Sequence, residues 1–243
     1  MTTPGSLRSW LIAFAALAVL AVTLALGAWQ LDRGRQREAL HRAVQQRQAL
    51  PPLGNEALLG AGPAADLMHR PIAVRGTWAA RHTVFLDNRQ MNGKPGFFVV
   101  TPLLLEGGAA AVLVERGWVP RNFERREQLP PVATPAGTVQ VRGRIAPPPA
   151  KLYEFDGAAA GAIRQNLDLG RFAAETGLPL LAVAVRQTGD DTPDGLLRQW
   201  PEPASGAAKN YGYAFQWWAL AAATAILYVW FQFIAPRRKV PPA

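Results

Sequence analysis

The chain contains no cysteine, which excludes disulfide bonds and thiolate metal sites. Its three histidines, His41, His69 and His82, are too far apart for the i, i+4 pairing that binds a metal on one helix. The sequence also lacks a phosphate-binding glycine loop, a nucleophile elbow and a serine beside a histidine. We therefore predict no metal site and no enzymatic activity.

Carboxylates are present, but no spacing in the sequence brings two of them together as an acid–base pair. Asp87, Glu115 and Asp156 could meet in the folded chain, yet nothing local requires it. Because charged side chains lie mostly in solvent, we expect these three at the surface.

Charged residues are absent from two stretches near the ends of the chain, residues 11–31 and 213–234. Each is about 21 residues long, and at about 1.5 Å per residue such a helix crosses a hydrocarbon core of about 30 Å. A cleaved signal peptide is the alternative for the first stretch, but its apolar run exceeds the usual 7 to 15 or so residues. We predict two transmembrane helices, with residues 32–212 on one side of the membrane.

Positive charges flank both spans. Arg8 and residues 237–239 lie on the terminal side, whereas residues 33–37 carry three arginines on the other side. Long loops cross membranes largely regardless of their charge, so the C-terminal cluster decides the prediction. We place residues 1–10 and 235–243 in the cytoplasm and the middle segment outside it.

The formal net charge is +9, and all 17 acidic residues lie in the middle segment. The basic residues do not alternate with aromatic residues in a nucleic-acid-binding motif. A basic surface close to anionic headgroups explains the excess, so we predict membrane lipid and not nucleic acid as a partner.

Between the spans the sequence changes from a helical to a strand pattern. Residues 32–50 predict a helical extension of the first span that ends at two prolines, and residues 53–66 predict a loop. Residues 89–96 predict a hairpin loop, and residues 168–176 predict one short helix. Six strands are predicted, at residues 71–79, 83–88, 97–105, 111–119, 138–145 and 180–187. The fold class is an α+β membrane protein, in which two transmembrane helices flank one mostly antiparallel β extracytoplasmic domain with few short helices.

The membrane boundaries carry unusual polar and aromatic residues. Trp29, Arg33 and Arg37 follow one stripe of the first helix, which also fits an interfacial tryptophan with an arginine beside it. On the second span one face carries a side-chain amide at a depth within the membrane. An amide there needs a polar partner, so this face should meet the first helix, a partner or a ligand. That face comprises Tyr213, Gln216, Trp217, Leu220 and Thr224. Close packing of the two spans is predicted through Ala219 and Ala223 against Ala21 and Ala25.

Several of these segments, in this order, resemble motifs of the Surfeit locus protein 1 family. The resemblance covers nearly the whole chain and both spans. The motif residues are Gly27, Trp29, Gln30 and Arg33; Asp87, Asn88 and Arg89; Gly96 to Leu103; Glu115, Arg116, Gly117, Trp118 and Pro120; Gln165, Asn166, Leu167 and Asp168; and Tyr213, Ala214 and Trp217.

The resemblance implies a factor for the assembly of haem-copper cytochrome c oxidase, acting at the haem a step of the large subunit. The implied partners are that subunit and the machinery that makes or delivers haem a. It also implies a bacterial plasma (inner) membrane protein with a periplasmic domain, since no Arg- and Ser-rich presequence precedes the first span. The alternative from residues alone is a membrane-anchored extracytoplasmic module that binds or senses a ligand other than haem.

By the same resemblance, haem a is the implied cofactor, held by Trp29, Arg33, Tyr213, Gln216 and Trp217. The remaining motif residues are expected to be structural or to face a partner: Gly27, Gln30, Asn88, Arg89, Gly96, Arg116, Gly117, Trp118 and Asn166. Family members often carry a histidine where this chain has Asn210, and asparagine is not among the usual axial ligands of haem iron. Tyr211 or Tyr213 could replace it, the alternative being a tyrosine at the membrane interface.

Overall fold

The computed structural model describes residues 7–122, 124–125, 128–149, 161–189, 194–200 and 205–235. The chain divides into two compact units, Met1–Ala43 with Pro203–Ala243, and Val44–Glu202. Asp156 and the basic terminus predicted beyond Ala235 lie outside the described residues.

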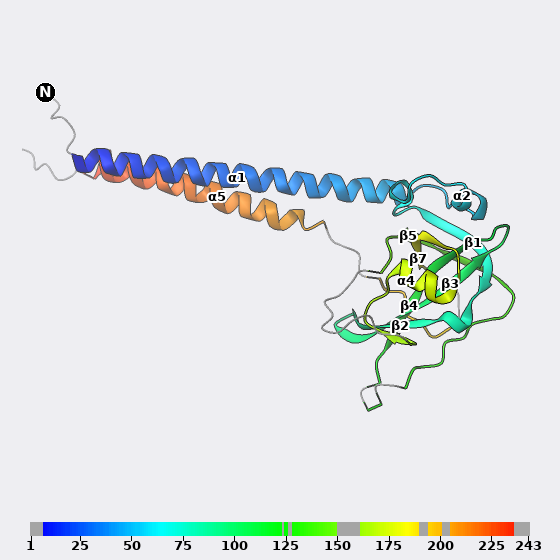
Figure 1. Cartoon of the computed structure of the whole chain (residues 1–243). Coiled ribbons are helices and arrows are strands. Elements are labelled where there is room, and N and C mark those ends of the chain that lie inside the picture. Colours follow the sequence, from blue (N-terminus) through cyan, green and yellow to red (C-terminus); the bar gives the residue numbers. More distant parts are fainter. Residues whose placement is uncertain are drawn as a thin grey trace, which may run out of the picture. The chain divides into compact units, whose positions relative to one another are not determined.

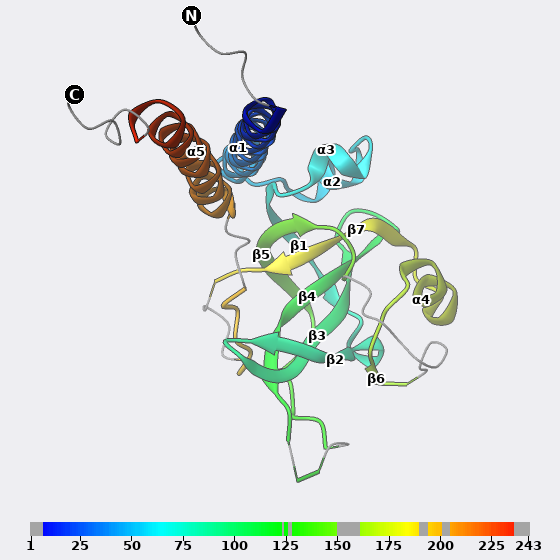
Figure 2. The ribbon, with the colours of Figure 1, turned by 90° about the vertical axis from the view of Figure 1, so that its left-hand side faces the viewer.

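Two long helices form the first unit and run side by side (Figures 1 and 2). Helix α1 spans Leu7–Gln48, and α5 spans Ala207–Val229 and continues as the π-helical segment η2, Trp230–Ile234. Helix α1 passes without a break through Asp32, which confirms the predicted helical extension, and its last turn belongs to the second unit. By length and composition both helices could cross a membrane.

The contact between these helices uses small residues. The buried positions of α5 follow a helical stripe, Ala207, Asn210, Ala214 and Ala221, and those of α1 are Thr23, Gly27 and Gly34. The predicted pairing of Ala219 and Ala223 with Ala21 and Ala25 is wrong, because all four are exposed. The packing stripe of each helix is two residues away from the predicted one, as Thr23 is from Ala21 and Ala221 from Ala219, and a shift of two residues leads to the opposite side of a helix.

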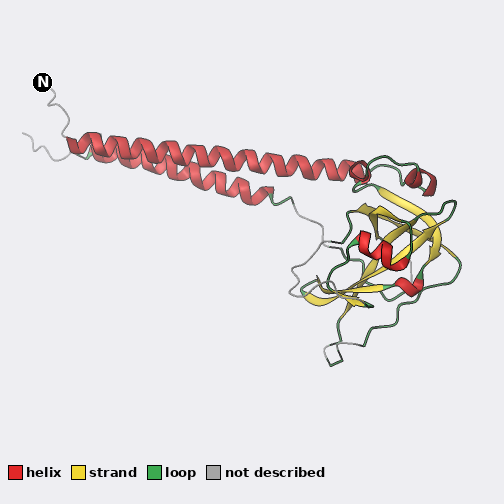
Figure 3. Ribbon diagram, viewed as in Figure 1, coloured by secondary structure: helices red, strands yellow, loops and turns green. Residues whose placement is uncertain are grey.

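The second unit is built on a seven-stranded sheet (Figure 3). All six predicted strands are present, and the two-residue β6 is added. The strands are β1 Pro71–Trp78, β2 Val84–Met91, β3 Lys94–Leu105, β4 Ala111–Pro120, β5 Thr138–Ala146, β6 Ile163–Arg164 and β7 Leu180–Gln187. Most neighbours are antiparallel, as predicted, while β4 with β7 and β2 with β6 are parallel.

Five of these strands form a closed ring. The sheet order is β1-β5-β7-β4-β3-β2-β6, and β1 also pairs with β3 through Gly76 and Leu105. Strands β2 and β6 therefore extend the ring on one side. Closure removes the edges of β1 and β3 that would otherwise expose unpaired backbone groups.

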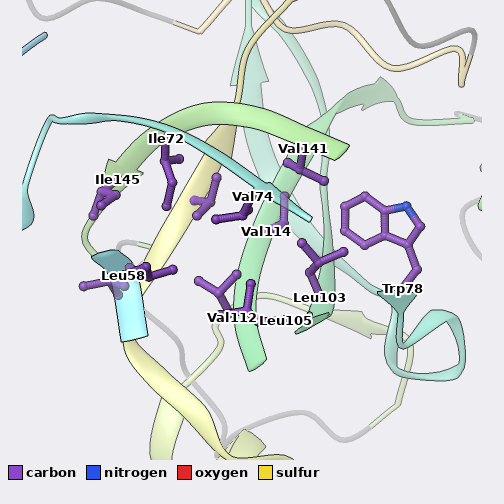
Figure 4. Close-up of a cluster of buried hydrophobic side chains, with 12 residues drawn as sticks. Leu58, Ile72, Val74, Trp78, Leu103, Leu105, Val112, Val114, Val141 and Ile145 are labelled. Carbon is purple, nitrogen blue, oxygen red and sulfur yellow. The ribbon is translucent and has the colours of Figure 1, made fainter. Parts of the chain in front are cut away.

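A hydrophobic cluster is formed by residues from the five ring strands together with Leu58 (Figure 4). Leu58 comes from helix α2, Asn55–Leu59, which is followed by α3, Ala64–Leu67. The prediction of a loop at residues 53–66 is therefore wrong in part. Burial of Leu58 against the cluster stabilises a short helix in a segment whose glycine, alanine and proline content favours a loop.

Two further predictions concern local turns. Helix α4, Leu169–Thr176, has Asp168 as its N-cap and Gly177 as a left-handed C-cap, which confirms the predicted helix. The hairpin loop predicted at residues 89–96 is wrong in its length. Strand β2 continues to Met91 and β3 begins at Lys94, so the turn consists of Asn92 and Gly93, both with positive φ.

Candidate functional site

A pocket of about 590 Å³ lies between α1 and α5 within the helical unit. Helix α1 contributes a polar stripe over two turns, and α5 contributes its first turns. The lining residues are Trp29, Gln30, Asp32, Arg33, Gln36, Arg37, Lys209, Asn210 and Tyr213. The pocket therefore joins segments from the two ends of the sequence.

One hydrogen bond ties these segments together. The Nδ2 group of Asn210 donates to Oε1 of Gln30 over 2.7 Å, and Asn210 is only 8% exposed. Asn210 therefore holds the two helices together. A polar pair of this kind strengthens helix association where water is excluded.

A second set of hydrogen bonds orients the α1 side of the pocket. Gln36 donates to the Asp32 carboxylate over 2.7 Å and accepts a longer bond of 3.5 Å from Arg33. All three side chains are exposed at the pocket.

The pocket combines positive charge with aromatic surface. Three cations, Arg33, Arg37 and Lys209, line it against the single carboxylate of Asp32. Trp29 and Tyr213 are 59% and 53% exposed. Such a surface suits an anionic group attached to a flat or apolar body.

The predicted haem-binding residues are not all brought together. Trp29, Arg33 and Tyr213 line the pocket with Gln30 and Asn210, whereas Gln216 and Trp217 do not. Gln216 is exposed and Trp217 is half-buried. Asp32, Gln36 and Lys209 also line the pocket but were not predicted. Two of them could have been found from their positions, because Gln36 lies one helical turn after Asp32 and Lys209 is next to Asn210.

Tight packing above and below the pocket fixes the helix pair. A Cβ atom on Gly27 would lie 2.2 Å from Nε1 of Trp218, so only glycine lets this indole approach α1. Gly34 lies under the ring of Tyr211, whose hydroxyl donates to Glu38 over 2.7 Å. Tyr211 is therefore engaged with α1 and does not line the pocket.

Three of the remaining motif segments meet at Arg89 inside the β domain. Its guanidinium donates to the carbonyl oxygen of Gln165 over 3.0 Å, and its own carbonyl accepts from Nε1 of Trp118 over 2.9 Å. Burial lowers the pKa of Arg89, and the carboxylate of Glu115 opposes that shift. Asn166 is half-buried in the connection between β6 and α4. This set of residues holds strands together.

Neighbouring motif residues occupy the same sheet. Gly96 pairs with Pro120 and Gly117 with Val99 in the β3–β4 ladder. Asn88 is exposed with a φ of 59° at an irregularity of β2, so this motif residue faces solvent.

The surface location expected for the carboxylates is wrong for Asp87 and Glu115. Glu115 is 1% exposed and accepts from Nε of Arg186 over 2.7 Å. Asp87 is 9% exposed and pairs with Arg121. Each is buried because an arginine from another segment neutralises it, which the spacing of acidic residues along the sequence does not reveal. Among the described residues, no group of three His, Asp or Glu side chains could hold a metal ion.

Residues 17–222 match the model of the SURF1 family. The chain belongs to the SURF1 family. The match includes Gln30, Asn210 and the other residues that line the pocket, as well as the whole β domain.

Relatives in the family come from distant organisms. Surfeit locus protein 1 of Arabidopsis thaliana is 31% identical over 119 residues, 44% of this chain and 33% of that protein. The yeast protein named Cytochrome oxidase assembly protein SHY1 is 26% identical over 98 residues, 40% of this chain and 25% of that protein. The chain thus spans a third and a quarter of the length of these two relatives. A SURF1-like protein of Mycobacterium bovis is 26% identical over 234 residues, covering 92% of this chain and 85% of that protein.

Proposed function

We propose that this protein assists the assembly of a haem-copper cytochrome c oxidase, at the step in which haem a enters the large subunit or is stabilised there. Membership of the SURF1 family and the name of the yeast relative, a cytochrome oxidase assembly protein, support this role. The single observation that carries it is the pocket in which motif residues from both ends of the chain, such as Gln30 and Asn210, meet. We propose an assembly factor and not a catalyst.

The lining of the pocket suits the carboxylates at the edge of a haem but not its iron. Arg33, Arg37 and Lys209 supply positive charge for the carboxylates at the edge of a porphyrin. Tyr213 is the only usual axial ligand among the lining residues, and it is half-exposed, while the Asn210 amide is bonded to Gln30. These residues do not form an enclosed iron site, so we propose that the pocket contacts the oxidase subunit and the edge of its haem.

The proposed location follows from the two candidate spans. We place α1 and α5 in a bacterial plasma membrane, with the β domain on the periplasmic side. The basic and aromatic pocket would then lie at the periplasmic membrane surface, where a partner subunit embedded in the same membrane can reach it.

Deletion of the gene tests the role in assembly. We expect less assembled oxidase and less haem a in isolated membranes, restored by the wild-type gene. Arg33→Ala should restore both poorly, because Arg33 lines the pocket, whereas Arg35→Ala, an exposed neighbour outside the lining, should restore them fully. Normal oxidase in the deletion strain would contradict the proposal.

Purification of the tagged protein from cells that make haem a distinguishes a docking pocket from a haem carrier. Co-purification of oxidase subunits without a Soret band is expected for a docking pocket. A Soret band that is lost in Tyr213→Phe would instead identify this chain as a haem carrier. Absence of oxidase subunits from the preparation would favour a sensing module unrelated to the oxidase.

A further inference from the structure

A groove of about 760 Å³ lies between α1 and α5, at the end of the helix pair where α1 begins and α5 ends (Figure 2). Each helix contributes one stripe of side chains, from Arg8 to Val19 on α1 and from Thr224 to Gln232 on α5. The groove shares no lining residue with the pocket of the candidate site. Its volume is within the range of about 300 to 1,000 Å³ for sites that bind small molecules.

The two helices do not pack tightly along this groove. The buried residues of α1 begin at Thr23, and those of α5 end at Ala221. Among the described residues, none from Leu7 to Val22 and none from Ala222 to Ala235 is buried. The helix pair is therefore closed by its own side chains in one half only, and the other half leaves room for a further group.

Polarity changes along the groove. Arg8 and Gln232 line its outer end, whereas Val19 and Leu227 lie further in. From Arg8 to Val19 helix α1 rises about 16 Å, at about 1.5 Å per residue. This is close to half of a hydrocarbon core of about 30 Å. The groove therefore has the length of one membrane leaflet, with a polar end for a headgroup and an apolar end for an acyl chain.

The charge at the outer end is positive and has no counterion from the helix pair. Arg8 is exposed, and residues 1–31 and 203–243 contain no aspartate or glutamate. The first carboxylate along α1, that of Asp32, is about 36 Å further along the helix axis. A phosphate from outside the chain can accept from the guanidinium of Arg8 in a charge-assisted hydrogen bond.

We propose that this groove binds one anionic phospholipid, with its phosphate at Arg8 and Gln232 and one acyl chain along the apolar part. The lipid completes the half of the helix contact that the side chains leave open. A transmembrane helix of a partner or of a second copy would also cover apolar side chains, but it would not balance the charge of Arg8. The inference rests on the proposed position of α1 and α5 in the membrane, and not on the role in oxidase assembly.

Two lipids with the same acyl chains test the role of charge. The purified full-length protein in detergent is titrated with dioleoylphosphatidylglycerol or dioleoylphosphatidylcholine, and native mass spectrometry counts the lipids that stay bound. Because an arginine near an anionic surface contributes about 1 kcal/mol, the first phosphatidylglycerol should bind about fivefold more tightly than the first phosphatidylcholine. Glycerol 3-phosphate at millimolar concentration should not displace it, since the free headgroup lacks the acyl chain.

Three results of this titration would overturn the proposal. Equal affinity for the two lipids would mean that the groove takes up acyl chains regardless of charge. Displacement by glycerol 3-phosphate would mean that a phosphate alone is bound. A dimer that persists in the spectra at saturating lipid, with no lipid retained, would assign the groove to a second copy of the chain.

A pair of arginine variants on α1 locates the headgroup. Arg8→Gln removes the charge at the groove and should remove most of the fivefold preference for phosphatidylglycerol. Arg35→Gln removes the same charge from an exposed position outside the groove, and should keep the preference of the wild type. A full preference in Arg8→Gln, or an equal loss in both variants, would place the headgroup elsewhere and contradict the proposal.

A pair of alanine variants locates the acyl chain. Ala15→Phe places a ring in the groove and should weaken phosphatidylglycerol binding about fivefold or more, because the ring occupies the space of the chain. Ala21→Phe places the same ring at an exposed position of α1 outside the groove, and should bind the lipid as the wild type does. Circular dichroism establishes that both variants are folded. Unchanged lipid affinity in folded Ala15→Phe would show that the chain lies outside the groove.

Discussion

Asn210 shows how much one amide can determine in a helix pair. Its side chain bonds to Gln30 across 180 positions of sequence, at a buried place between two helices with few other polar contacts. The exposed amide Gln216, two turns further along α5, makes no described hydrogen bond and lies outside the pocket. Burial and partner, rather than residue type, distinguish the two amides.

Replacement of Asn210 by leucine should destabilise the helix pair. The change removes the bond and leaves Oε1 of Gln30 without its donor, so the free energy of unfolding in detergent micelles should fall by about 0.6 to 2 kcal/mol. Gln216→Leu makes the same chemical change at an exposed position and should have little effect.

A double-mutant cycle with Gln30→Leu checks the cause. The effects of Asn210→Leu and Gln30→Leu should not add, because each removes the same bond. Additive effects, or an equal loss in Gln216→Leu, would show that the hydrogen bond does not hold the helices together.

At the scale of elements, the turn between β2 and β3 depends on two residues with positive φ. Asn92 has a φ of 51° and Gly93 a φ of 75°. A side chain that is branched at Cβ is strained in this conformation, so Gly93→Val should lower the free energy of unfolding of the β domain by about 1 to 2 kcal/mol. Urea titration of the full-length protein, followed by near-ultraviolet circular dichroism, measures the loss.

Gly62→Val is the matched control for this turn. Gly62 is exposed, has an ordinary φ, and its Cβ would meet open space. The control should be as stable as the wild type. A similar loss in both variants would attribute the effect to valine at the surface and not to the turn.

The pair between Arg164 and Glu175 links β6 to α4 and should respond to acid. The Arg164 guanidinium donates to both oxygens of Glu175, over 2.7 and 2.5 Å, and lowers the pKa of that carboxyl from its ordinary 4.5. A lowered pKa means that the folded state holds the proton less tightly than the unfolded state. The pair therefore stabilises the fold fully above pH 4.5, and the contribution is lost as the pH falls through the folded-state pKa.

Glu175→Gln removes the titrating group. The difference in unfolding midpoint between wild type and variant should be largest at neutral pH and should disappear in acid. It will be small because Glu175 is half exposed and solvent screens the pair. A difference that grows in acid would contradict the assigned sign.

Strands and helices were predictable where a repeating pattern was strong. The alternation of Val139 and Val141 with Gln140 and Arg142 gave β5, and the N-cap and C-cap residues gave α4. The hairpin loop was predicted too long because residues 89–91 include polar side chains, although they continue β2. Buried ion pairs such as Glu115 with Arg186 were not predictable, since their partners are 71 positions apart and meet only in the folded sheet.

The candidate site was predictable only in part for a similar reason. Helical spacing placed Trp29 and Arg33 on one stripe of α1, and both line the pocket. On α5 the same reasoning chose the face of Tyr213 and Gln216 for a partner or ligand and the small residues Ala219 and Ala223 for packing, whereas the contact with α1 uses Ala214 and Ala221. Size complementarity between two helices depends on both sequences at once, and a single periodic pattern does not contain it.

At the scale of the whole molecule, the two candidate spans predict on which side of the membrane each part lies. We expect two crossings, which would place both ends of the chain on one side and the β domain on the other, in the periplasm. Because the natural sequence has no cysteine, single introduced cysteines report their side without background. Three positions suffice: Arg8 at the start of α1, Gln90 in β2 and Ala235 after η2.

A membrane-impermeant maleimide is applied to cells whose outer membrane is permeabilised and whose inner membrane is intact, and it should label Gln90→Cys. Arg8→Cys and Ala235→Cys should react only after the inner membrane is opened, and the wild type should not react at all. Gln90→Cys protected while the other two react would reverse the orientation and place the β domain in the cytoplasm. Different labelling of Arg8→Cys and Ala235→Cys would mean that one of the helices does not cross, because only an even number of crossings returns the chain to the side where it began.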